Sequence, residues 1–131
     1  MRLDSVQFPM VWMYPNENDP AGAFEAFDAL LARQQPCVMI SRNGDTEHEH
    51  APQERKQVAL WLKRNKPALR VYVKGVIQIE PNAAKRLAIK AFMIMLSKAW
   101  GCPMFVAESE PAALEMAHKL LAGETLPALT D

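Results

Sequence analysis

The sequence predicts one α/β domain: a four- or five-stranded sheet, mostly parallel or mixed, with alternating helices. Short apolar segments rich in β-branched and aromatic residues alternate with longer segments whose apolar residues recur at helical spacing. Prolines and glycines separate most of these segments. Repeated strand–helix units build parallel sheets covered by helices, because each helix carries the chain back to start a neighbouring strand. With 131 residues, the chain has the length of one domain.

Four segments are predicted to be strands. The first, MVWMY, lies between Pro9 and Pro15. The second, CVMIS, is apolar almost throughout, which is typical of a buried parallel strand. The predicted strands are residues 10–14, 37–41, 70–80 and 104–107. In the third strand, one face is expected to carry Val71, Val73, Ile77 and Ile79.

Four helices are predicted to follow these strands. Asp19 and Pro20 suit the start of the first helix, and Pro36 prevents it from continuing. Ser109 is a suitable N-cap for the last helix, and Gly123 lies just past its end. The predicted helices are residues 20–34, 52–66, 83–100 and 110–122.

The composition is that of a globular protein, with half of the residues apolar and 23% charged. The most apolar run, residues 91–96, is far shorter than the ~20 residues that span a bilayer. Two cysteines, Cys37 and Cys102, form no disulfide framework. We therefore expect a cytoplasmic protein without membrane contact, with residues 1–123 as one domain and residues 124–131 as a flexible tail.

The charges are unevenly distributed along the chain, although the net charge is zero. Residues 55–98 contain eleven lysines and arginines and one acid, Glu80, whereas the remainder contains four basic residues and fourteen acids. One interpretation is that folding mixes the two sets into an even surface. The other is a basic face that binds an anionic partner. A nucleic-acid partner is not favoured, because the whole chain is neutral and no nucleic-acid-binding motif is present.

The predicted helix at residues 83–100 is apolar on almost every side. A helix packed on a sheet needs only one apolar stripe, so a second side must be buried against a neighbouring helix or another chain. We expect the sheet-facing side to carry Leu87, Ala91, Ile94 and Met95. The opposite side is then expected to bind a second copy of the chain, as a homodimer, or another protein. Its residues are Ile89, Phe92, Met93, Leu96 and Trp100.

The segment SRNGDTEHEH, residues 41–50, carries two histidines and three acids close together. In an extended chain His48 and His50 point the same way, and imidazole with carboxylate suits zinc or nickel. The competing interpretation, which we prefer, is a solvated turn: NGD is a turn signal, and negative charge is favourable just before a helix. A small enzyme or metal-dependent protein that uses residues Asp45–His50 stays the alternative function.

Two further site hypotheses concern the carboxyl ends of the strands. Ligands of parallel sheets bind there, which makes Tyr14, Arg42 and Asn43 candidate rim residues. Ser41 and Thr46 are candidate phosphorylation sites. The sequence contains no nucleophile elbow, no phosphate-cradling glycine loop and no dinucleotide fingerprint. No catalytic residue and no cofactor is therefore predicted.

Two stretches carry a family resemblance. CPMFVAESEPAALEMAHKLL is similar to the closing strand, acidic turn and alanine-rich helix of the STAS and SpoIIAA-like group of small α/β bacterial domains. VYVKGVIQIEPNAAKRLAIKAFMIML resembles the preceding strand and helix of that group. The resemblance implies a SpoIIAA-like fold and a non-enzymatic, regulatory domain that binds proteins or small ligands. The group's phosphorylation motif, Asp-Ser-Ser/Thr-Gly, is absent from the corresponding ISRNGDTEH, so no functional residue is carried over.

Overall fold

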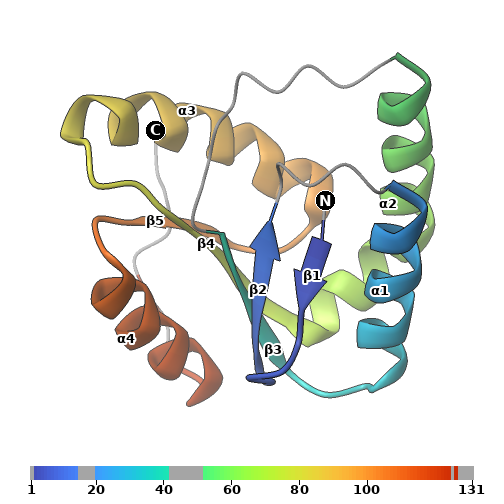
Figure 1. Cartoon of the computed structure of the whole chain (residues 1–131), viewed down its shortest axis with the longest axis horizontal. Coiled ribbons are helices and arrows are strands. Elements are labelled where there is room, and N and C mark those ends of the chain that lie inside the picture. The colour runs from blue at the N-terminus through green and yellow to red at the C-terminus, as the bar shows by residue number, and fades with distance from the viewer. Residues whose placement is uncertain (1, 15–19, 42–51, 125, 127–131) are drawn as a thin grey trace.

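The computed structural model describes residues 2–14, 20–41, 52–124 and 126. In these residues the chain forms a five-stranded mixed sheet with four helices, which confirms the predicted fold class (Figure 1). The strands are β1 (Arg2–Asp4), β2 (Met10–Tyr14), β3 (Cys37–Ser41), β4 (Val73–Ile79) and β5 (Met104–Ala107). The helices are α1 (Pro20–Ala32), α2 (Pro52–Tyr72), α3 (Ala83–Trp100) and α4 (Glu110–Leu121).

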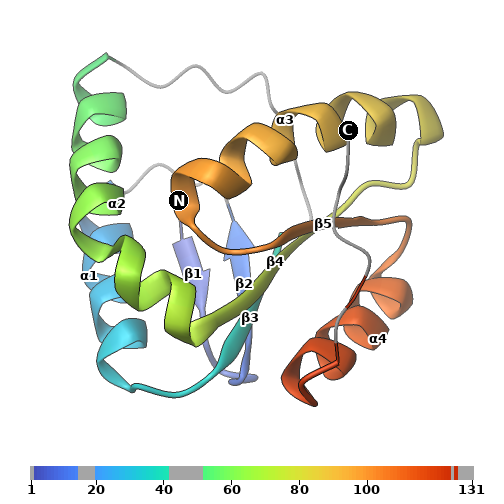
Figure 2. The ribbon, with the colours of Figure 1, turned by 180° about the vertical axis from the view of Figure 1, so that it is seen from behind.

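The strands lie in the sheet in chain order, β1-β2-β3-β4-β5. β2 to β5 are parallel, and β1 is antiparallel to β2. The connections that contain α1, α2 and α3 pack on one face of the sheet, whereas α4 packs on the other (Figure 2). The strand prediction missed β1, because three residues are too few to display an alternating pattern.

The second helix is longer than the sequence predicts. The helix was expected to end at Lys66. The next residue, Pro67, lacks the N–H that bonds to the preceding turn of a helix. Instead α2 continues through Pro67 to Tyr72 and bends along its length (Figure 2). The predicted strand start at Arg70 was therefore wrong, and Val71 is an exposed helical residue.

The expected single apolar face of β4 was also wrong. Cys37 of β3 pairs with Val73, but the next residue, Val38, pairs with Gly75. This shift leaves one extra residue in β4. Each later residue of β4 therefore faces the side of the sheet opposite to the one that alternation from Val73 predicts. As a result Val73 packs in the core under α1, α2 and α3, which we call the three-helix core. Ile77 packs on the α4 side of the sheet.

Each face of the sheet has its own apolar core. The larger core lies under α1, α2 and α3, and the smaller one lies between the sheet and α4. Leu126 packs against the smaller core, so this described residue of the predicted tail contacts the domain. Within the described ranges, no helix is both long enough and apolar enough to cross a membrane.

Candidate functional site

Helix α3 has well-defined ends. The side chain of Asn82 accepts a hydrogen bond from the Lys85 backbone N–H at 3.0 Å, which caps the N-terminus. Gly101 ends the helix in the left-handed conformation with φ 76°, and its N–H donates to the Ser97 carbonyl. These signals were visible in the sequence, and the predicted range 83–100 is confirmed.

The predicted orientation of α3 about its axis was wrong. Ile89 and Met93 do not face outward but are buried in the three-helix core. The residues expected to face the sheet include Leu87 and Met95, which are 72% and 63% exposed. Because α3 is apolar on nearly every side, its sequence does not distinguish the buried stripe from the outer one.

The other three residues predicted to contact a partner, Phe92, Leu96 and Trp100, have different positions. Phe92 is 42% exposed and belongs to the outer face. Trp100 is partly buried, and its ring lies 5.8 Å from that of Phe27 on α1. The side chain of Leu96 lies outside the described part of the structure. We call the exposed apolar residues from Leu87 to Ala99 the α3 outer face: Leu87, Ala88, Ala91, Phe92, Met95 and Ala99.

Basic side chains adjoin the α3 outer face, and further ones lie on α2. Lys85, Lys90 and Lys98 are the exposed charged residues of α3 itself. Lys66 of α2 adjoins the end of α3, because a Cβ on Gly101 would lie 2.9 Å from Lys66 Cγ. The other described cations of α2 are exposed and comprise Lys56, Lys63, Arg64 and Arg70.

An aromatic cluster holds the three helices of this face together. The Trp61 ring of α2 lies 5.0 Å from that of Phe27 and 6.0 Å from that of Phe24, both on α1. Trp61 Nε1 donates a hydrogen bond to Asp28 Oδ1 at 3.0 Å. Trp61 therefore packs toward α1 and does not cover the α3 outer face.

The predicted ligand rim is described only in part. Tyr14 ends β2 and packs on the α4 side of the sheet. Ser41 ends β3 and, by alternation with Met39, belongs to the three-helix side. The other candidates for a rim, a phosphorylation site or a metal site lie outside the described residues; they are Arg42, Asn43, Thr46, His48 and His50.

The structure brings Ser41 together with a residue that sequence reasoning missed. Ser41 of β3 pairs in register with Gln78 of β4, so their side chains are neighbours on one face. Ser41 Oγ and Gln78 Nε2 are both buried, and neither has a hydrogen-bond partner. A buried polar group without a partner costs about 1–3 kcal/mol. The signal that could have revealed Gln78 is its place as a polar residue between Ile77 and Ile79.

The two cysteines are buried in the three-helix core as free thiols. Burial raises the pKa of Cys37 from 9.0 to about 11. It raises the pKa of Cys102 to about 12, with a further contribution from the charge of the Cys37 thiolate. Thiols with such high pKa values are poor nucleophiles and metal ligands at neutral pH. The described residues contain no group of three or more metal-ligating side chains.

Comparison with known proteins adds no relative: no family model matches the chain, and no curated protein or solved structure is significantly similar to it. The candidate site therefore has to be interpreted from its own geometry.

Proposed function

We propose that this chain is a non-catalytic binding module that docks another protein on the α3 outer face. The observation that carries the proposal is the exposure of three large apolar side chains, Leu87, Phe92 and Met95, on one helix. Full burial of one such side chain contributes about 1.5–3 kcal/mol, so covering all three would stabilise a complex considerably. Contiguous exposed apolar residues rimmed by charge are typical of protein-binding sites.

The packing of the neighbouring elements supports this proposal. The buried stripe of α3 already contacts the sheet through Ile89 and Met93. Trp61 is directed toward α1 by its hydrogen bond to Asp28. Neither neighbour is available to cover Met95, so we assign its cover to a second molecule.

Site-specific photo-crosslinking tests the proposal. A photoreactive amino acid replaces Met95 in cells that naturally produce the protein, and a matched probe replaces Glu115, an exposed residue of α4. We expect a covalent adduct from the Met95 position that is absent from the Glu115 position. Phe92→Glu should abolish this adduct while leaving the fold intact, because Phe92 is partly exposed. Equal adduct yields at both probe positions would reject the proposal.

A small polar ligand is a second candidate, favoured by the buried pair Ser41 and Gln78. Both groups can donate a hydrogen bond to one ligand oxygen, and they lie near the carboxyl ends of parallel strands, where ligands commonly bind. Mass spectrometry of small molecules released from gently purified protein tests this function. A molecule bound to the wild type and lost from Ser41→Ala/Gln78→Met would support it. Protein that releases nothing would reject it.

We also propose a cytoplasmic location and membership of the STAS and SpoIIAA-like group. The buried free thiols Cys37 and Cys102 suit a reducing compartment.

The observed succession of β5, Glu108 and α4 is consistent with the closing unit on which the resemblance rests. Cell fractionation tests the location. Metal analysis of untagged protein tests the alternative function at Asp45–His50, which requires stoichiometric bound metal.

A further inference from the structure

We infer that the protein docked on the α3 outer face presents an acidic segment and is a different chain from this one. This inference rests on the proposed function and adds the chemistry of the partner. It follows from the charges that surround the apolar residues and from the symmetry of possible self-association.

The charged side chains that α3 carries are all basic. Lys90 follows Leu87 by three residues and Lys98 follows Met95 by three, so each lysine neighbours an outer-face residue on the helix surface. From Lys56 to Trp100 the only acid is Glu80, which is partly buried at the end of β4. Within the described residues, the cations of α2 and α3 form no ion pair. Their charge is therefore available to a partner.

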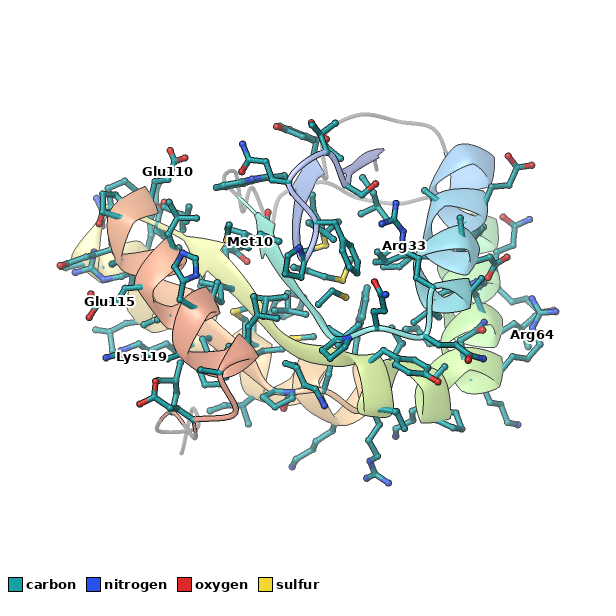
Figure 3. All side chains as sticks on the ribbon, turned by 90° about the horizontal axis from the view of Figure 1, so that it is seen from below. Met10, Arg33, Arg64, Glu110, Glu115 and Lys119 are labelled. Atoms are coloured by element: carbon teal, nitrogen blue, oxygen red, sulfur yellow. The ribbon has the colours of Figure 1, made fainter. Side chains whose placement is uncertain are left out.

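The acidic residues of the described chain lie elsewhere. Glu110 and Glu115 project from α4 at one end of the molecule, whereas Arg64 of α2 lies at the other (Figure 3). Glu25 and Asp28 belong to α1. Helix α3 itself carries no acid, whereas α1, which packs beside α2 through Asp28 and Trp61, carries two.

Self-association through this face is disfavoured by symmetry. A two-fold homodimer places the same patch of both copies together. Lys90 and Lys98 would then meet the same two lysines of the second copy, and like charges brought together cost free energy. An acidic segment instead gains attraction from these lysines while its apolar residues cover Leu87, Phe92 and Met95.

The apolar centre also favours a protein segment over nucleic acid. Non-specific nucleic-acid binding depends on phosphate contacts by lysine and arginine and does not need large aliphatic side chains. Methionine is an adaptable contact residue, because its unbranched side chain repacks easily. Met95 and Leu87 would therefore accommodate apolar side chains of a peptide or helix.

The test extends the Met95 photo-crosslink to its product. Sequencing the crosslinked peptide by mass spectrometry is expected to identify a different protein and a segment in which aspartate and glutamate outnumber lysine and arginine. The inference fails, and the docking function survives, if the segment is neutral or basic or belongs to a second copy of this chain. Equal adduct yields at Met95 and Glu115 would reject the docking function itself.

Charge variants provide the second measurement. A synthetic peptide with the crosslinked sequence should bind Lys90→Glu/Lys98→Glu at least about tenfold more weakly than the wild type. Lys119→Glu on α4 is the matched control and should bind like the wild type, because α4 lies on the opposite face of the sheet. Binding to the wild type should also weaken as salt rises, since screening reduces exposed charge attraction. An affinity unchanged by both the double variant and salt would overturn the inference.

Discussion

Gly75 determines how closely α4 can approach the sheet. A Cβ at this position would lie 2.7 Å from Leu120 Cδ1 and 3.1 Å from Phe105 Cε2. The first distance is shorter than real carbon contacts allow, so a side chain would have to move. The missing side chain thus lets a helix residue and a neighbouring strand residue fill the same space.

Gly75→Ala should lower the free energy of unfolding by about 1–3 kcal/mol, because the added methyl overpacks the core under α4. Urea denaturation measures this loss. In a Leu120→Val background the same substitution should cost less, since valine is shorter and relieves the closest contact. An equal cost in both backgrounds would contradict this explanation.

Trp61 links α1 to α2 by one hydrogen bond and two ring contacts. Trp61→Phe keeps an aromatic ring but removes the donor to Asp28, so we expect a loss of about 0.5–1.5 kcal/mol in unfolding free energy. Thermal unfolding of this variant, of Asp28→Ala and of the double variant measures the coupling. If the two single losses simply add, the hydrogen bond does not contribute.

At the scale of an element, α3 shows how an almost wholly apolar helix is divided between core and surface. Its buried stripe includes Ile89 and Met93, which pack under the helix against the sheet. Its outer stripe includes Leu87 and Met95. The sequence alone placed these four residues on the wrong sides but Phe92 on the correct one, because both stripes are apolar.

Two methionines on α3 provide a matched comparison. Met93→Ala should lower the free energy of unfolding by about 2–5 kcal/mol, because Met93 is 2% exposed and its removal leaves a cavity. Met95→Ala should change it by less than about 0.5 kcal/mol, because Met95 is exposed. Both values come from urea denaturation of the isolated protein. Similar losses would show that Met93 is not more deeply buried than Met95.

At the scale of the whole molecule, the sheet separates two apolar cores. Both cysteines belong to the larger core, and burial raises their pKa values to about 11 and about 12. In the unfolded chain a cysteine loses its proton near pH 9. The cysteines thereby couple the stability of the whole molecule to alkaline pH.

The direction of this coupling follows from the protons bound in each state. Above about pH 9 the unfolded chain releases thiol protons that the folded protein keeps, so the free energy of unfolding should fall as pH rises toward 11. Urea denaturation between pH 8 and about 11 measures the slope. Cys37→Ala/Cys102→Ala should show a shallower fall over the same range. Identical slopes for the two proteins would contradict the raised pKa values.

Apart from β1, the sequence alone determined which elements form and in what order. Strands β2, β3 and β5 and helix α3 have the predicted bounds. Their signals are local: apolar alternation, capping residues such as Asn82, and the glycine or proline that ends a segment all act between near neighbours in the chain. The α/β class follows from these elements, because alternating strands and helices pack in few ways.

Tertiary structure alone decided which sides of β4 and α3 are buried. The shift of β4 against β3 turned Ile77 to the α4 side and brought Gln78 beside Ser41. Packing of α3 against the sheet likewise buries Met93 and leaves Met95 exposed. These choices depend on contacts between residues far apart in the chain, which local propensity does not specify. The candidate binding surface is such a choice, since it consists of the apolar residues of α3 that the core leaves uncovered.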